Sequence, residues 1–252
     1  MTDTTDINNT SAYDGANASA AADANLSAAS GAKKIPSYQG TLRSHTLSVP
    51  ECIYKCSGIV IFGRRIKSLV FSTDVAVIKN INTDAVIAVY PFTPQPVISQ
   101  AIISVSDAPV FVGVGGGLTG GDRTVRLAQE AENQGAYGVV VNAPIDANII
   151  PLIKQTIELP VVATIVSQKQ DIDRRIEVGA DILNVAASVK TPELVRAIRE
   201  RYPDIPIIAT GGPTDESIIK TIEAGANAIT YTPPTNGEVF EQTMSRYRQR
   251  YE

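Results

Sequence analysis

The loop at residues 115–121 is the clearest candidate for binding an anion. Five of its seven residues are glycines. Glycine lets the backbone approach a ligand closely, and successive amide N–H groups can form a nest for negative charge. The sequence therefore predicts ligand contacts from this loop and from the first cation after it, namely Gly115, Gly116, Gly117 and Arg123. A flexible loop without a ligand is the alternative.

A second glycine pair, in the segment TGGPT at residues 210–214, directly precedes a predicted helix with an acidic first turn. A helix N-terminus that follows such a loop can bind phosphate through its unpaired amides. We therefore predict phosphate contacts from Thr210, Gly211 and Gly212. The alternative is a tight turn between a strand and a helix, with Thr214 as an ordinary N-cap.

Three polar side chains at or just after the ends of predicted strands are candidates for catalysis. Asp74 would act as a general base, Asn142 would orient a substrate hydroxyl or carbonyl, and Lys190 would supply positive charge to an anion. Each has a structural alternative. Asp74 could cap a helix, Asn142 could make a buried structural hydrogen bond, and Lys190 could be a solvated surface cation.

Three more side chains at predicted strand ends are weaker candidates for ligand binding or catalysis. Tyr90 could line a pocket or simply pack, and Lys169 could bind an anion or lie in solvent. Glu238 is a second candidate carboxylate, although an acidic residue in the first turn of a helix also stabilises the helix dipole.

Metal chemistry has few candidate ligands in this chain. The sequence contains one His and two Cys, which excludes a disulfide framework. Cys52 and Cys56 are four residues apart and could meet a metal together with His45, but packing of the two thiols is the favoured interpretation. We predict no metal site, metal-independent chemistry and no cofactor.

The elements that must position these residues are βα units. From about residue 67 onward, short β-branched runs alternate with helix-period segments. Gly135, Gly179 and Gly225 each end a helical pattern before a strand, where a left-handed C-cap is needed. The predicted strands span residues 68–73, 85–92, 109–114, 138–144, 160–166, 182–188, 206–212 and 228–234.

An internal repeat supports this organisation. PVVAT at residues 160–164 recurs as PIIAT at 206–210, and IEVGAD at 176–181 recurs as IEAGAN at 222–227, both with an offset of 46 residues. A fixed period indicates a repeated supersecondary unit. Eight consecutive strands without a long excursion favour an α/β fold of the compact (β/α)8 TIM-barrel type, in which the carboxyl ends of the strands hold the active site.

The regions before the barrel differ in composition. Residues 1–40 are dominated by Ala, Asn, Ser, Thr and Asp and contain few large aliphatic side chains, so we predict a disordered tail. In residues 41–66 we predict a short helix at 49–57, starting at Pro50, followed by an apolar run at 59–62. We predict that this segment caps the bottom of a barrel formed by residues 67–252.

Overall composition limits the partners. The net charge is −4, which lacks the basic excess of a nucleic-acid binder and argues against nucleic acid as a partner. Neither an apolar run long enough to span a membrane nor a signal peptide is visible. We expect a cytoplasmic protein that binds a small anionic metabolite and no membrane. A homo-oligomer is left open.

One segment carries a family resemblance. PIIATGGPTDESIIKTIEAGANAITY at residues 206–231 looks like the strand 7 to strand 8 region of phosphate-binding barrels of the ribulose-phosphate-binding type. More closely, LVFSTDVAVI, AVYPFTPQP, GVGGGLTGGDR and VVVNAPI are similar to compact bacterial barrel proteins labelled only "hydrolase". The chain departs from the family after strand 8, where TPPTNG replaces the usual Gly-Ser or Gly-Thr pair, and strand 6 lacks the lysine of the keto-acid aldolases.

The resemblance implies an enzyme acting on an anionic, phosphorylated metabolite, either a hydrolase or a sugar-phosphate lyase or isomerase. The alternative is a non-catalytic metabolite sensor similar to the glycerol-3-phosphate-responsive antiterminator proteins.

Overall fold

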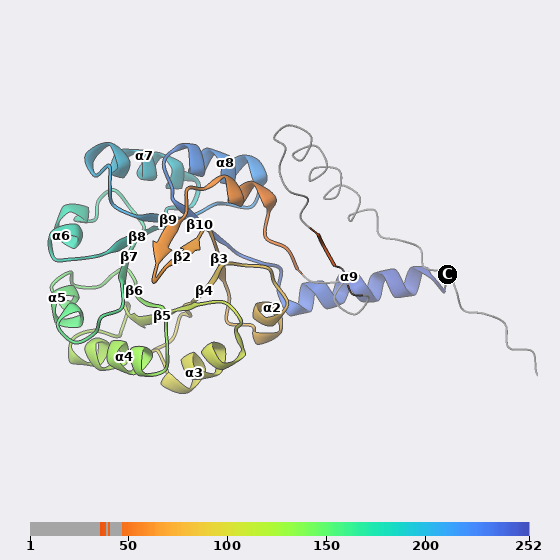
Figure 1. The fold of residues 1–252 in the computed structure, drawn as a ribbon, viewed down its shortest axis with the longest axis horizontal. Helices are drawn as coiled ribbons and strands as arrows, with labels where there is room; N and C mark the ends of the chain where they lie inside the picture. Colours follow the sequence, from red (N-terminus) through yellow and green to blue (C-terminus); the bar gives the residue numbers. More distant parts are fainter. Residues whose placement is uncertain (1–35, 39, 41–46, 252) are drawn as a thin grey trace, which may run out of the picture. The chain divides into compact units, whose positions relative to one another are not determined.

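Eight parallel strands close into a barrel in the computed structural model of this protein (Figure 1). The structure describes residues 36–38, 40 and 47–251, so nearly all of the predicted tail, and His45, lie outside the described residues. The strands follow one another around the barrel, and the last pairs with the first. They are β3 (Ser68–Phe71), β4 (Ala85–Ala88), β5 (Val110–Gly115), β6 (Gly138–Val141), β7 (Val161–Ile165), β8 (Ile182–Val185), β9 (Ile207–Thr210) and β10 (Ala228–Tyr231).

Helices connect successive strands and surround the barrel (Figure 1). Gly135, Gly179 and Gly225 have φ values of 88°, 101° and 110°, as predicted for left-handed residues at the ends of helices. The α-helices are α2 (Val75–Lys79), α3 (Pro96–Val105), α4 (Asp122–Asn133), α5 (Ile149–Lys154), α6 (Ile172–Glu177), α7 (Thr191–Arg201), α8 (Asp215–Glu223) and α9 (Asn236–Gln249), and the 3₁₀ helices are η2 (Glu51–Lys55) and η3 (Ser188–Lys190).

The predicted TIM barrel is confirmed, and each predicted strand overlaps an observed one. Several predicted strands extend beyond the carboxyl end of the observed strand. Residues 186–188, for example, lie after the end of β8, and Ser188 begins η3 with a φ of 56°. The observed strands stop where the chain turns toward the next helix.

The internal repeat has a structural cause at the start of the strands. The Asp181 carboxylate accepts the Val161 N–H at 2.8 Å, and the Asn227 side-chain oxygen accepts the Ile207 N–H at 2.9 Å. Asp84 accepts the N–H groups of Lys67 and Ser68 in the same way. A side chain before one strand thus satisfies backbone donors before or at the start of the preceding strand, which buried amides require.

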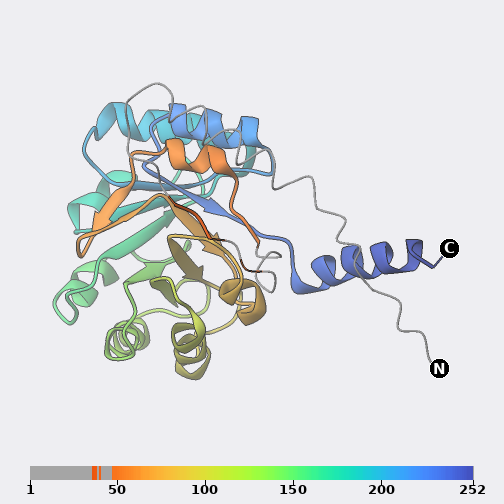
Figure 2. The ribbon, with the colours of Figure 1, turned by 45° about the vertical axis from the view of Figure 1, so that its right-hand side comes forward.

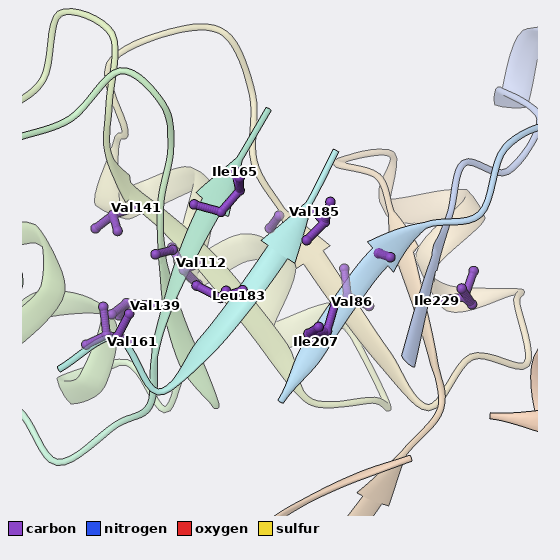
Figure 3. Packing of buried hydrophobic residues seen from close by; sticks show 14 of the residues in the cluster. Val86, Val112, Val139, Val141, Val161, Ile165, Leu183, Val185, Ile207 and Ile229 are labelled. Carbon is purple, nitrogen blue, oxygen red and sulfur yellow. The ribbon is translucent and has the colours of Figure 1, made fainter. Parts of the chain in front are cut away.

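The core has two parts because the strand side chains alternate between the two faces. The outer part lies between the strands and the helices, and Figure 3 shows its members on β4 to β10, including Val112, Val161 and Ile229. The inner part fills the lower interior of the barrel. It contains residues such as Leu69, Phe111, Val140, Val162, Ile182, Ile208 and Ala228.

A β-hairpin that the sequence did not predict lies against this inner core. It consists of β1 (Ile59–Ile61) and β2 (Arg64–Ile66), with Phe62 and Gly63 as a two-residue turn at φ 45° and 79°. Ile59, Ile61 and Ile66 pack on residues at the start of the barrel strands. The Tyr137 hydroxyl donates to the Ile61 carbonyl at 3.0 Å, which fixes the hairpin to the bottom of the barrel.

The chain before the hairpin packs on the outside of the barrel. Ile53 of η2 is fully buried, and the Val49 N–H donates to the Asn82 side chain at 2.8 Å. The predicted helix at 49–57 is a shorter 3₁₀ helix, η2. At the other end of the chain, α9 has no buried residue and leaves the barrel (Figure 2). No helix among the described residues could span a membrane.

The hairpin generates a stability prediction. Ile66 is 1% exposed, whereas Val60 on the opposite face of the hairpin is 61% exposed. We expect Ile66→Ala to lower the free energy of unfolding by about 2–5 kcal/mol, because it leaves a cavity at the barrel bottom. Val60→Ala should change it by less than about 0.5 kcal/mol. Urea unfolding followed by circular dichroism measures both, and equal effects would contradict the packing described here.

Candidate functional site

Neutral polar side chains line the interior of the barrel near the carboxyl ends of its strands. Thr164, Asn184 and Thr230 each lie two residues beyond an inward apolar residue of the same strand, so they also point inward. Asn142 directly follows β6. We call Asn142, Thr164, Asn184 and Thr230 the interior polar cluster. It stands above the apolar inner core and at the end of the barrel where this fold places its active sites.

Hydrogen bonds join three members of the interior polar cluster. The Thr164 hydroxyl donates to the Asn142 side-chain oxygen at 3.1 Å, and the Asn184 amide nitrogen donates to the Thr164 hydroxyl at 3.3 Å. Because Thr164 bonds to both neighbours, it fixes the orientation of the two amides. The chain of bonds crosses three strand positions, from the end of β6 through β7 to β8.

Two oxygens of the cluster have no partner. The Asn184 side-chain oxygen and the Thr230 hydroxyl are buried without a hydrogen bond from any described residue, and Thr230 is only 6% exposed. A buried polar group without a partner costs about 1–3 kcal/mol. The interior polar cluster therefore offers an acceptor and a hydroxyl to a ligand that reaches into the barrel.

Of these four residues, the sequence pointed only to Asn142. Its predicted alternative, a structural hydrogen bond, is present, because its oxygen accepts from Thr164. The signal for Thr164 was visible in the PVVAT repeat, which puts a threonine at the inward position near the end of a strand. Thr is common in strands, so that position alone did not distinguish a site.

Asp74 caps a helix. One carboxylate oxygen accepts the N–H groups of Ala76 and Val77 at 2.9 and 3.2 Å. The other accepts the Asn236 N–H at 3.3 Å. Asp74 thus ties the start of α2 to the start of α9, next to the β10–β3 junction that closes the barrel. Both of its oxygens are engaged with backbone amides, so its predicted structural alternative is what the geometry shows.

The first glycine loop packs on the interior polar cluster. A Cβ at Gly116, whose φ is 122°, would come within 2.7 Å of Asn142, so only glycine allows this approach. The Gly116 N–H donates to the Thr119 carbonyl at 2.8 Å and is not free for an anion. Gly115 is buried against Thr124, whereas Gly117 borders open space. Whether this loop binds a ligand stays a prediction.

The second glycine pair leads into a helix whose N-terminal amides are partly occupied. Thr214 and Ser217 form a capping box at the start of α8, and two acidic residues stand in its first turn. The Gly211 N–H donates to the Thr230 carbonyl at 3.3 Å. Thr214 therefore is the ordinary N-cap that was the alternative. Phosphate contacts from Thr210, Gly211 and Gly212 stay a prediction.

The remaining candidates lie at the rim. Arg123, Lys169 and Lys190 are exposed. The Tyr90 hydroxyl accepts the Gln95 N–H at 2.8 Å and orders its own loop. Glu238 forms a capping box with Thr235, whose N–H and hydroxyl lower the pKa of the Glu238 carboxyl.

The two thiols are packing groups. Both are buried, and burial raises the pKa of the Cys56 thiol to about 12. Burial, with Asp215 nearby, also raises the pKa of Cys52. Among the residues that the structure describes, no three His, Cys, Asp or Glu side chains gather in a way that could hold a metal ion.

Comparison with known proteins identifies the fold. No family model matches the chain. A phosphonopyruvate hydrolase in complex with oxalate and Mg²⁺ is 15% identical, with a TM-score of 0.56 over 75% of this chain and 84% of that one. A phosphoenolpyruvate phosphomutase from Streptomyces platensis subsp. rosaceus is 12% identical, with a TM-score of 0.55 over 78% and 83%.

A third structure, 2,3-dimethylmalate lyase, is described as a member of the PEP mutase/isocitrate lyase superfamily. It is 12% identical, with a TM-score of 0.55 over 79% of this chain and 80% of that one. These likenesses show a TIM barrel. The three structures are named as two phosphonate or phosphoenolpyruvate enzymes and a member of the PEP mutase/isocitrate lyase superfamily, and none of the three is named as a barrel of the ribulose-phosphate-binding type.

The interior polar cluster predicts opposite effects for two similar substitutions. Thr164→Val should lower the free energy of unfolding by about 1–3 kcal/mol, because Asn142 and Asn184 both lose a partner. Thr230→Val removes a hydroxyl that has no partner, so it should leave stability unchanged or raise it by up to about 1 kcal/mol. Denaturant unfolding of both variants tests this. A loss at Thr230 as large as that at Thr164 would mean that its hydroxyl is satisfied.

Proposed function

We propose that this protein is an enzyme acting on a small anionic, phosphorylated metabolite at the carboxyl end of its barrel. The observation that carries the proposal is the pair of buried, unpartnered oxygens on Asn184 and Thr230. They lie where TIM barrels hold their substrates. A folded protein tolerates such groups at a functional site because a ligand satisfies them.

The interior polar cluster constrains which end of the ligand enters. All four side chains are neutral, and the free oxygen of Asn184 accepts hydrogen bonds only. The part of the ligand inside the barrel therefore carries a donor such as a hydroxyl. The anionic end stays at the rim, where Gly117 borders open space and Arg123 is exposed.

We assign the candidate catalytic residues, one in the interior polar cluster and two at the rim, the following roles. Asn142 orients the substrate hydroxyl or carbonyl, Lys190 offsets negative charge, and Asp74 is the proton acceptor at the β10–β3 junction. The reaction is that of a hydrolase, or of a sugar-phosphate lyase or isomerase. Structural neighbours named as a phosphonopyruvate hydrolase and a 2,3-dimethylmalate lyase support a small anionic substrate.

No step in this proposal uses a metal. Mg²⁺ in one structural neighbour raises the question, and carboxylates are the usual protein ligands of that ion. Asp74 and Glu238, the two carboxylates predicted at strand ends as candidates for catalysis, are both engaged in capping helices. The interior polar cluster adds only amides and hydroxyls. The described residues therefore do not fit a carboxylate-held magnesium ion, and metal-independent chemistry stays a prediction.

A non-catalytic metabolite sensor is the second candidate. Both oxygens of Asp74 accept backbone N–H groups, which favours a structural role for the only proposed base. In such a protein the interior polar cluster would bind the ligand without turning it over. A cytoplasmic location and a homo-oligomer also stay predictions. The exposed Phe240 and Tyr247 side chains on α9 provide apolar surface that an assembly could cover.

A ligand screen tests binding. We expect at least one sugar phosphate, phosphorylated keto acid or inorganic phosphate at millimolar concentration to raise the melting temperature, since a ligand of the native state stabilises it by mass action. The shift should shrink in Thr230→Val, which we expect to be at least as stable as the parent protein. If no phosphorylated compound shifts the parent protein, the anion site is wrong.

Asp74→Asn separates an enzyme from a sensor. Asn caps a helix about as well as Asp, but its amide nitrogen cannot accept the Asn236 N–H. The melting temperature should therefore fall slightly, and the variant should remain folded. We expect turnover of the substrate found by the screen to fall below detection, because an amide cannot accept the proton. Unchanged turnover would remove Asp74 from the mechanism. Binding without turnover in the parent protein would favour the sensor.

A further inference from the structure

We propose that the barrel carries a second binding site, for a small molecule bearing a phosphate or carboxylate group, at the end opposite to the interior polar cluster. A cleft of about 240 Å³ opens there between β2, α2 and the loops that precede β4 and β5. Its charged lining residues are Arg64, Arg65, Lys79, Asp84 and Asp107. The volume is close to that of ordinary small-ligand pockets, which begin at about 300 Å³.

Both acidic residues of the cleft already have hydrogen-bond partners. Asp107 pairs with Lys79 at 2.6 Å. One oxygen of Asp84 accepts the N–H groups of Lys67 and Ser68 at 2.9 and 3.0 Å, where the chain enters β3. Lys79 offsets the charge of Asp107, whereas Asp84 keeps its negative charge because its backbone donors are neutral. The three cations that line the cleft still outnumber its two carboxylates.

The two arginines have no such partner. Neither Arg64 nor Arg65 makes an ion pair with any described residue. Arg64 lies opposite Ile61 in the hairpin and on the same face as Ile66, whose side chain is buried against the barrel. That register places Arg64 on the barrel-facing side of the hairpin and Arg65 on the opposite side with Val60. Both arginine side chains are exposed, and both line the cleft.

Backbone geometry fixes the stem of Arg65. A Cβ at Gly58, whose φ is 83°, would lie 2.6 Å from Cγ of Arg65, so the stem packs directly on the glycine. Holding the stem reduces the entropy lost when the guanidinium binds. A guanidinium presents parallel N–H donors that match carboxylate and phosphate oxygens.

The opposite wall suits the body of such a ligand. Ile78 and Ile81 line the cleft next to the charged groups, so a short apolar or hydroxylated chain can lie between them and the hairpin. A ligand held in this way bridges β2 and α2. It therefore stabilises the segment that closes the barrel bottom, and its binding does not depend on the candidate active site.

Calorimetric titration of the full chain with inorganic phosphate and, separately, with succinate tests the site at constant ionic strength. We expect phosphate, succinate or both to bind. The anion with the higher affinity shows whether the site prefers a phosphate or a carboxylate group. The double variant Arg64→Ala/Arg65→Ala should lose at least about tenfold in affinity. The variant Arg64→Lys/Arg65→Lys keeps the positive charges without the paired N–H donors. Its affinity should lie between that of the parent protein and that of the double alanine variant.

Two controls separate this site from others. Arg126→Ala removes an exposed cation from α4 and should leave affinity unchanged. Circular dichroism checks that the double variant is folded. Equal affinity of the parent and the double variant, or no binding of either anion, would overturn the proposal. A loss only in Thr230→Val would assign the anion to the candidate active site instead.

Discussion

Closure of the barrel between β10 and β3 is the interaction on which the rest of the structure depends. Ile229 pairs with Ser68 and Tyr231 with Val70, so the sheet has no unpaired edge. Once closed, parallel strands bring all their carboxyl ends into one ring and all their starts into the other. Residues from four different strands can then meet in the interior polar cluster, although they are far apart in sequence.

The two rings have opposite physical characters. At the strand starts, apolar side chains and the hairpin fill the interior, and side chains such as Asp181 satisfy the first backbone amides. At the carboxyl ends, the interior is polar and contains unpaired oxygens. Apolar packing inside the barrel is therefore concentrated at one end, and the unpaired interior oxygens lie at the other. This separation lets the upper residues remain unsatisfied without unfolding the protein.

The strands and helix ends could be predicted because their signals are local. β-branched runs and glycines such as Gly179 act within a few residues. The hairpin was missed because its turn is Phe62-Gly63 rather than one of the usual Asn-Gly or Asp-Gly pairs. The site was only partly predictable for a different reason. Asn184 matters because its oxygen lacks a partner, and the role of Asp74 depends on Asn236, which is 162 residues away. Neither property exists within a single stretch of sequence.

The C-terminal helix has a consequence for how the molecule opens. Because α9 buries none of its residues, its backbone hydrogen bonds are protected only by the helix–coil equilibrium of that segment, and isolated helices of this length are marginal in water. Amide hydrogens of α9 in the single chain should exchange with solvent through local fraying. Those of the barrel strands should exchange only when the barrel unfolds globally. Within residues 47–251, α9 should therefore open independently of the barrel, with the boundary near the Thr235 cap.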